Sequence, residues 1–140
     1  MNHVVNDYFK RDTYAQKLGI TIEKVDKGYA KGRMSVSEDM LNFHGTANGG
    51  CIFSLADTVF ACASNSYGQT AVGITVTIHY LAAAKVGDEL VAVATEDNKS
   101  NKLGLYRMEI VNQENTLLAL AEGMVYRTKH QFCENEADEA

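Results

Sequence analysis

The sequence of 140 residues contains no proline and no tryptophan, and it has only three cysteines. Without proline, no turn is fixed by a pyrrolidine ring, so the turns depend on glycine, asparagine and aspartate. Cys51, Cys62 and Cys133 form no CxxC pair, and their spacing matches no zinc or disulfide framework. We therefore expect reduced thiols.

The chain also lacks a basic cluster and a membrane-spanning run. Its formal net charge is −5, and its lysines and arginines are scattered among acidic residues, which argues against nucleic acid as a partner. The apolar stretch around Asp57 is interrupted too soon to cross a bilayer, and the N-terminus does not combine a basic region with an apolar run. These absences predict a cytoplasmic protein that neither enters a membrane nor binds nucleic acid.

The composition is that of a globular domain. With 46% apolar and 22% charged residues, the chain can build a substantial core, while 140 residues are too few for two comfortable domains. No internal repeat or low-complexity linker divides it. We expect a single domain over residues 1–140, with an acidic, disordered tail from about residue 130.

The N-terminal part of the chain predicts a helix followed by a hairpin. Apolar residues recur at helical spacing from residue 4 to 18, and Gly19 stands where a C-terminal cap would. Segments 20–25 and 29–36 alternate apolar with polar residues on either side of Asp26-Lys27-Gly28. This is the pattern of two half-buried strands joined by a tight turn.

A second helix, expected from about residue 48 to 66, is apolar nearly all round and decides the architecture. The strands expected after it are 71–81, 89–97, 103–113 and 116–128. An apolar helix must be enclosed, and in a small domain an antiparallel sheet has to curl around it. The expected fold class is therefore α+β, an antiparallel sheet wrapped around one long central helix, with an additional N-terminal helix. The edges of such a sheet predict pairing with a second subunit across a two-fold axis.

Asp57 is the only carboxylate in this apolar helix. Among neighbours such as Phe53 and Val59, an ionised carboxylate is costly unless water, a partner or hydrogen-bond donors reach it. Burial would raise its pKa toward the range useful for a general base or nucleophile. The alternative is a structural role, in which Ser54, Ser64 or a hydroxyl of a partner subunit satisfies the carboxylate.

Gly49 and Gly50 open the same helix. Amides in the first turn of a helix have no acceptor within it, and no side chain blocks these two, so they can hold an oxyanion or a polarised carbonyl. Asp57 lies two turns further on, roughly 12 Å of axial rise from Gly49. One substrate molecule cannot easily contact both Gly49 and Asp57 of the same helix. In a symmetric dimer, however, Asp57 of one subunit approaches the helix tip of the other.

Two segments resemble the active-site region of a known family. Residues 42–50 read Asn-x-x-Gly-x-x-Asn-Gly-Gly, and residues 55–58 read Leu-Ala-Asp-Thr. Together with the strand order, they resemble the hot-dog-fold acyl-CoA thioesterases of the phenylacetate-degradation (PaaI) branch, and the resemblance covers nearly the whole chain. It implies a hot-dog fold and hydrolysis of an aromatic or short-to-medium acyl-CoA to free acid and CoA. It also implies no cofactor or metal, and a homodimer with shared active sites that pairs into a dimer of dimers.

The resemblance assigns catalytic roles residue by residue. Asn42 orients a water together with Asp57, which acts as base or nucleophile, and Gly49 donates its N–H to the thioester oxygen. Thr75, on the strand after the helix, is similar in position to a hydroxyl residue that assists the carboxylate in some members. The family usually has a histidine where this chain has Asn48, and an amide can donate a hydrogen bond but cannot shuttle a proton.

Further residues are candidates for substrate binding on weaker grounds. They are Gly50, Thr77, His79, Tyr80, Lys85 and Lys102. His79 and Tyr80 either line the acyl pocket or pantetheine channel or simply pack on the two faces of a strand. The lysines either meet the phosphates of CoA or are ordinary solvated side chains.

Three alternative functions are consistent with parts of the sequence. Cys51 with His44 suggests a thiol nucleophile at a helix N-terminus, but no third orienting group stands out. A hot-dog domain that binds acyl-CoA without turnover is favoured by Asn48 and opposed by the retained Asn42 and Asp57. A hot-dog dehydratase is disfavoured, since its His-x-x-x-Pro-Gly type of site needs a proline. His44 either compensates for the missing histidine or is an ordinary loop residue.

Overall fold

The computed structural model describes residues 3–133, with the side chains of residues 3 and 4 excepted. The elements are α1 (His3–Phe9), α2 (Thr13–Lys17), β1 (Thr21–Asp26), β2 (Tyr29–Ser35), the short 3₁₀ helix η1 (Glu38–Met40), α3 (Gly49–Ser64), β3 (Gln69–Tyr80), β4 (Glu89–Lys99), β5 (Leu103–Val111) and β6 (Leu117–Gln131). Strand β6 extends into the segment expected to be the acidic tail, and the rest of that tail, residues 134–140, lies outside the described residues.

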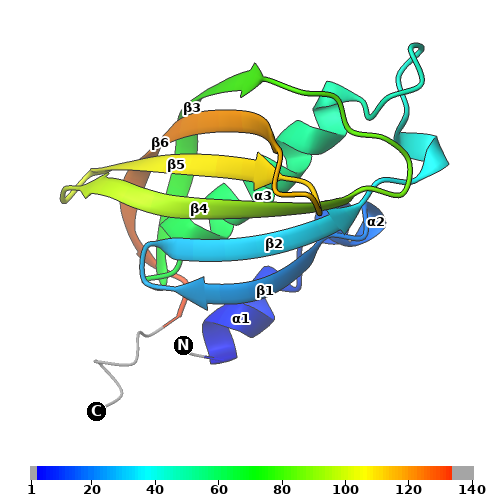
Figure 1. Ribbon diagram of the computed structural model, residues 1–140. Helices are drawn as coiled ribbons and strands as arrows, with labels where there is room; N and C mark the ends of the chain where they lie inside the picture. The colour runs from blue at the N-terminus through cyan, green and yellow to red at the C-terminus, as the bar shows by residue number, and fades with distance from the viewer. Residues whose placement is uncertain (1–2, 134–140) are drawn as a thin grey trace.

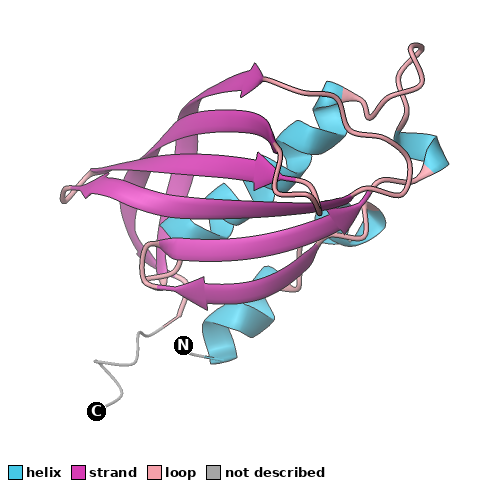
Figure 2. Ribbon diagram, viewed as in Figure 1, coloured by secondary structure: helices cyan, strands magenta, loops and turns pink. Residues whose placement is uncertain are grey.

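One six-stranded antiparallel sheet wraps around α3, as the sequence predicts (Figures 1 and 2). The strand order is β1-β2-β4-β5-β6-β3, so β1 and β3 form the two edges. The predicted hairpin is confirmed: Asp26 pairs with Tyr29, and Gly28 adopts a positive φ of 73° in the turn between them. The Gly28 amide also donates to the Ser66 hydroxyl at 2.8 Å, which ties this turn to the end of α3.

The N-terminal segment differs from the sequence prediction. Instead of one helix over residues 4–18, two short helices form, and residues 10–12 between them are not helical. The Asp12 carboxylate accepts a hydrogen bond from the Ala15 amide at 3.0 Å and caps the start of α2. An aspartate that bonds a nearby backbone amide starts a new helix in place of continuing the old one, which explains the error.

The buried face of α3 fills the inside of the curved sheet. Leu55, Ala56 and Val59 have no exposed surface. Phe60 lies against two glycines of the sheet, and a Cβ built on Gly123 would come within 2.7 Å of the ring, while one on Gly73 would come within 3.2 Å. The sheet can therefore approach the helix this closely only because both strands carry glycine at the contact.

One stripe of α3 is not covered by its own chain. Gly50, Asp57 and Ala61 are exposed, and they recur at helical spacing. The sequence predicts a helix enclosed nearly all round, and within one chain the enclosure leaves this side open. Small residues flank Asp57 on the open side, so another chain can approach it closely.

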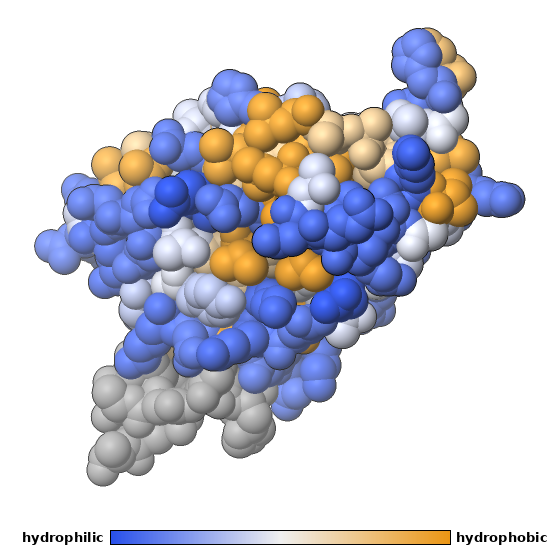
Figure 3. All heavy atoms as spheres, viewed as in Figure 1, coloured by the Kyte–Doolittle hydropathy of each residue, from blue (hydrophilic) through white to orange (hydrophobic). Residues whose placement is uncertain are grey.

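Strand β3 is a long, uncharged edge. Its 12 residues include no aspartate, glutamate, lysine or arginine, and Val72 and Ile74 are about half exposed, at 47% and 52%. The space-filling view shows hydrophobic side chains gathered over the region of β3 and β6 (Figure 3). Natural proteins usually place charges or proline on such an edge to prevent pairing. An edge strand without them therefore favours pairing with another strand.

The contact between Phe60 and Gly123 predicts a coupled stability effect. Gly123→Ala should lower the free energy of unfolding by about 1–3 kcal/mol, because the new methyl group overpacks the core against the ring. In a Phe60→Leu background the same substitution should cost clearly less, since the ring is gone. Urea unfolding of the two single variants and the double variant measures the coupling. Equal costs in both backgrounds would show that the ring does not press on this strand.

Candidate active site

The N-terminus of α3 offers one open amide. Asn48 is the N-cap, with φ −61° and ψ 134°, and its Oδ1 accepts a hydrogen bond from the Gly50 amide at 2.7 Å. The Gly49 amide occupies the first helical position, where no acceptor exists within the helix. Because Asn48 engages Gly50 through its oxygen, its Nδ2 group stays available as a second donor beside Gly49.

Tyr80, from the end of β3, closes one side of this helix tip. Its hydroxyl donates to the Gly49 carbonyl at 3.0 Å, and a Cβ on Gly49 would lie 3.2 Å from the Tyr80 ring. A surface hollow of about 470 Å³ lies here, and Asn42, Gly49 and Tyr80 are among its lining residues. The structure therefore brings these three predicted site residues together.

Asn42 shapes the loop that leads to the helix. Its Oδ1 accepts from the backbone amides of His44 at 2.9 Å and Thr46 at 3.2 Å, and its Nδ2 donates to the Thr46 hydroxyl at 3.1 Å. Within one chain, Asn42 is thus grouped with Gly49 and not with Asp57. Its expected role in orienting a water stays a prediction.

Asp57 lies on the open stripe of α3, and no donor among the described residues reaches its carboxylate. Its side chain reaches solvent in the single chain, yet the surrounding protein raises its pKa by desolvation, and the nearby Asp12 carboxylate raises it further. Ser54 donates instead to the Gly50 carbonyl at 2.8 Å, and Ser64 to Ala61. The structural alternative, in which Ser54 or Ser64 satisfies Asp57, is therefore not what the chain forms.

The remaining candidates on β3 lie apart from the helix tip. Thr75 is exposed, follows the bulge after Gly73, and forms no hydrogen bond with Asp57. Thr77 and His79 line a separate hollow of about 250 Å³. Since successive strand residues point to opposite faces, His79 and Tyr80 cannot share one pocket within a single chain.

The two candidate lysines are exposed and far from each other. Lys85 follows Ala84, which lines the hollow at the helix tip. Lys102 lies in the turn between β4 and β5, at the opposite end of the molecule from the start of α3 (Figure 1). Within one chain, only Lys85 is near enough to the tip to meet a ligand bound there.

The thiol alternative is disfavoured by the geometry. The Cys51 thiol is buried and donates to the Asn48 carbonyl at 3.0 Å, and burial raises its pKa, so the thiol stays protonated at neutral pH. His44 is exposed in the loop and contacts the ring of Phe43, at 4.2 Å between centroids. Over residues 3–133 there is also no group of three His, Cys, Asp or Glu side chains that could hold a metal, and no helix long and apolar enough to span a membrane.

Comparison with known proteins identifies the family. The model of the thioesterase superfamily matches residues 44–119, more than half of the chain, including α3 with Gly49 and Asp57. The chain belongs to the thioesterase superfamily. This thioesterase is 42% identical over 119 residues to the acyl-coenzyme A thioesterase PaaI of Escherichia coli, covering 85% of each protein.

Solved structures agree with this assignment. The structure of E. coli PaaI, from the phenylacetic acid degradation operon, superposes with a TM-score of 0.88 at 40% identity, over 90% of this chain and 91% of that one. A hypothetical thioesterase protein of Streptococcus pneumoniae, solved with coenzyme A, has a TM-score of 0.83 at 26% identity, over 89% and 98% of the chains. These comparisons confirm the predicted family, the hot-dog fold and the class of thioester hydrolases.

Asp12 is a residue near the site that sequence reasoning missed. The sequence places it in the middle of an expected helix, whereas it caps α2 close enough to Asp57 to raise the pKa of that carboxyl. An aspartate three residues before Ala15 is a capping signal that could have located the helix start. No signal in the sequence could have placed it beside α3, since this proximity is set by tertiary packing.

The raised pKa of Asp57 predicts a pH-dependent change in stability. A carboxyl whose folded-state pKa is raised makes the folded state less stable once it ionises, so Asp57→Asn should stabilise the thioesterase at neutral pH. The gain should shrink as the pH falls through the pKa of Asp57 and vanish below the ordinary aspartate value of 3.8. Thermal unfolding of Asp57→Asn and wild type from acidic to neutral pH measures the difference in stability.

The control for this experiment is Glu109→Gln, which removes an exposed carboxylate of β5 outside the site. A general effect of net charge would appear equally in both variants. A stability gain of Asp57→Asn that persists unchanged at low pH would contradict the argument.

Proposed function

We propose that this thioesterase hydrolyses an acyl-CoA to the free acid and CoA, with an aromatic or a short-to-medium acyl group. The observation that carries the proposal is the pair of half-sites on α3, an open amide at Gly49 and a carboxylate at Asp57 that no donor among the described residues reaches. The identity with E. coli PaaI, an acyl-coenzyme A thioesterase, supports the substrate class. The coenzyme A in the Streptococcus pneumoniae structure supports the same ligand.

The proposed chemistry uses only groups of this chain. The Gly49 N–H and Asn48 Nδ2 donate hydrogen bonds to the thioester oxygen and stabilise the negative charge that develops on it. Asp57, with Asn42 and Thr75 positioning the reacting groups, takes a proton from water as the water oxygen attacks the carbonyl carbon. The C–S bond then breaks, and CoA leaves as a thiolate. In the alternative route Asp57 attacks directly, and water hydrolyses the resulting anhydride.

The distances support a shared site in a homodimer. Gly49 and Asp57 lie roughly 12 Å apart along one rigid helix, so one thioester cannot contact both. The uncharged edge of β3 and the open stripe of α3 provide surfaces for a second copy. In the proposed dimer, Asp57 of one subunit faces the helix tip of its partner. The pairing of two dimers and the cytoplasmic location remain predictions.

A second candidate function is acyl-CoA binding without turnover, and one observation favours it. Asn48 replaces the residue that is usually histidine in this family, and its oxygen is engaged in capping α3. Saturable binding of acyl-CoA without release of thiol would support this alternative. Binding of acyl-CoA by Asp57→Asn without turnover is expected for both functions and does not distinguish hydrolysis from binding alone. The release of thiol by the wild-type protein therefore decides between them.

The first prediction for the reaction concerns the open amide. Gly49→Pro removes this N–H alone, because proline is well tolerated at the first helical position and the φ and ψ of Asn48 suit a residue before proline. The oxyanion loses a donor, so kcat should fall about 100-fold or more. Release of free thiol from a panel of acyl-CoAs measures the rate.

Gly49→Ala is the matched control, since it adds the same contact with Tyr80 but keeps the N–H. Asp57→Asn should also lose at least about 100-fold, as expected for a general base. The mechanism would be contradicted if wild type released no thiol from any acyl-CoA, or if Asp57→Asn were as fast as wild type. If Gly49→Ala and Gly49→Pro lower kcat equally, the Gly49 amide does not contribute to the mechanism.

The shared site predicts complementation between two inactive variants. Asp57→Asn and Gly49→Pro chains carrying different tags are co-expressed, and the heterodimer is isolated through both tags. One of its two sites combines an intact Asp57 with an intact helix tip, so the heterodimer should recover about half of the wild-type activity. The two homodimers isolated in parallel are the controls. A heterodimer as inactive as they are would mean that each site is completed within one chain.

A further inference from the structure

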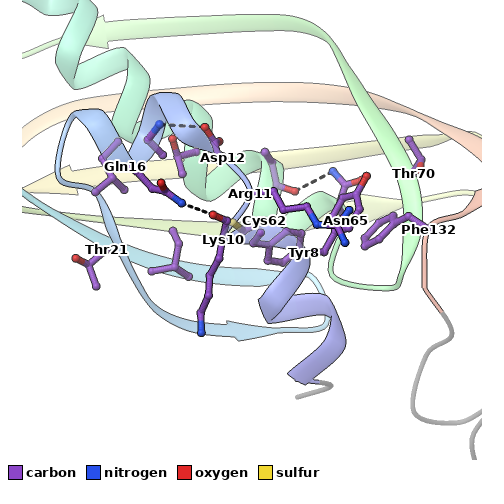
Figure 4. Close-up of a pocket in the computed structure, with 16 residues that line it drawn as sticks. Tyr8, Lys10, Arg11, Asp12, Gln16, Thr21, Cys62, Asn65, Thr70 and Phe132 are labelled. Carbon is purple, nitrogen blue, oxygen red and sulfur yellow. Dashed lines mark hydrogen bonds between the residues drawn. The ribbon is translucent and has the colours of Figure 1, made fainter.

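A second carboxylate, that of Asp12, lies beside the face of α3 that carries Asp57. Asp12 lines a cavity together with Thr58 and Ala61, which follow Asp57 by one and four residues on the helix. Ala61 is exposed on the same stripe of α3 as Asp57, and residues four apart on a helix are neighbours. Figure 4 shows Asp12 among the residues around this cavity, with its hydrogen bond to the Ala15 amide drawn as a dashed line. Asp12 is therefore held in place by its own cap bond, next to the part of α3 that presents Asp57.

Helix α2, which Asp12 caps, is tied to α3 by a side-chain hydrogen bond. The hydroxyl groups of Tyr14 and Ser54 lie 3.1 Å apart, and Ser54 precedes Asp57 by three residues. Ser54 donates its own proton to the Gly50 carbonyl at 2.8 Å, so it accepts from Tyr14. Residues three apart on a helix are neighbours, so this bond fixes α2 within one turn of Asp57.

The other groups around the cavity leave the charge of Asp12 uncompensated toward Asp57. The further titratable side chains that line it are Tyr8, Lys10, Arg11 and Cys62, while β1 and β3 contribute only the uncharged Thr21, Ile22 and Thr70. Arg11 lies over the ring of Tyr8, 4.8 Å from its centroid. Lys10 pairs with Asp7 at 3.6 Å, and in Figure 4 its side chain extends away from Asp12. Burial raises the pKa of the Cys62 thiol to about 12, so this group is uncharged at neutral pH.

We propose that Asp12 is a positioning residue for the hydrolysis, and that its negative charge beside Asp57 makes that carboxylate a stronger base toward water. The inference rests on the proposed function. Two neighbouring negative charges repel each other, and the repulsion is relieved when Asp57 takes a proton from the attacking water. Burial of Asp57 favours the same proton transfer, and both influences raise its pKa. Asp12 thus acts through Asp57 and touches neither the thioester nor the water.

Two substitutions separate the charge of Asp12 from its role as N-cap. Asp12→Asn removes the charge and keeps an oxygen that can cap α2, whereas Asp12→Glu keeps the charge on a residue that is not among the preferred caps. In Asp12→Asn, the acid limb of the pH profile of kcat/KM should move to lower pH, because Asp57 ionises more readily. Its rate at neutral pH should fall about 2-fold or more, because Asp57 is then a weaker base. The two profiles should therefore cross, while Asp12→Glu should keep the wild-type limb.

The matched control is Asp26→Asn, which removes an exposed aspartate of β1 outside the site and should leave the profile unchanged. All variants are assayed with the acyl-CoA that wild type hydrolyses fastest. Circular dichroism and native mass verify that each variant folds and assembles like wild type.

A titration of Asp57 tests the same coupling without turnover. The protein is labelled with ¹³C at the aspartate Cγ, and the signal of Asp57 is identified by its loss in Asp57→Asn. The pKa of Asp57 read from this signal should be lower in Asp12→Asn than in wild type, and unchanged in Asp26→Asn.

The outcomes distinguish this inference from the proposed function. A titration of Asp57 that Asp12→Asn leaves unchanged would overturn the inference, while thiol release by wild type would still support the thioesterase. A rate that Asp12→Asn lowers by the same factor at every pH would also overturn it, since a purely structural role of Asp12 has this effect. If wild type releases no thiol but Asp12→Asn lowers the pKa of Asp57, the proposed function fails and the coupling of the two carboxylates stands.

Discussion

The distance between the first amide of α3 and its carboxylate is fixed by the geometry of a helix, and the proposed function depends on this constraint. Gly49 and Asp57 are two turns apart, and the residues between them include Leu55 and Ala56, which are fully buried under the sheet. The helix cannot bend to bring its own two groups to one thioester without losing that packing. A donor for the oxygen and a base for the water are thus presented by one chain but meet, in the proposed mechanism, only when a second chain is added.

The surface of the single chain carries two features that suit such a partner. On α3, the positions that face outward are occupied by small residues and one carboxylate, whereas the outward positions of a solvated helix usually carry long charged side chains. On β3, a long edge strand has neither charges nor proline to prevent pairing. The residues that face outward in both features, such as Asp57 and Ile74, are exposed and so contribute little to the core.

Much of the fold could be predicted from the sequence, because hydrophobic periodicity reports directly on burial. The central helix, expected from about residue 48 to 66, runs from Gly49 to Ser64, and all six strands lie where alternation placed them. The break at Asp12, the loop around Asn42 and the engagement of Gly50 by Asn48 were not predictable in the same way. Each depends on a side chain that bonds nearby backbone, and such bonds leave no periodic pattern. The hollow at the start of α3, lined by Asn42, Gly49 and Tyr80, depends on contacts between segments far apart in the chain, which spacing does not encode.

The asparagine at position 48 is compatible with catalysis because of what the reaction requires. Its oxygen caps the helix by accepting from the Gly50 amide, so its Nδ2 group is left as a donor. A histidine could in addition protonate a leaving group. The group that leaves here is a thiolate, and a thiol has a pKa of about 8.5, so it departs near neutral pH without first receiving a proton. In the proposed mechanism, Asn48 therefore supplies a hydrogen bond to the developing oxyanion and lacks only a proton transfer on which the departure of CoA does not depend.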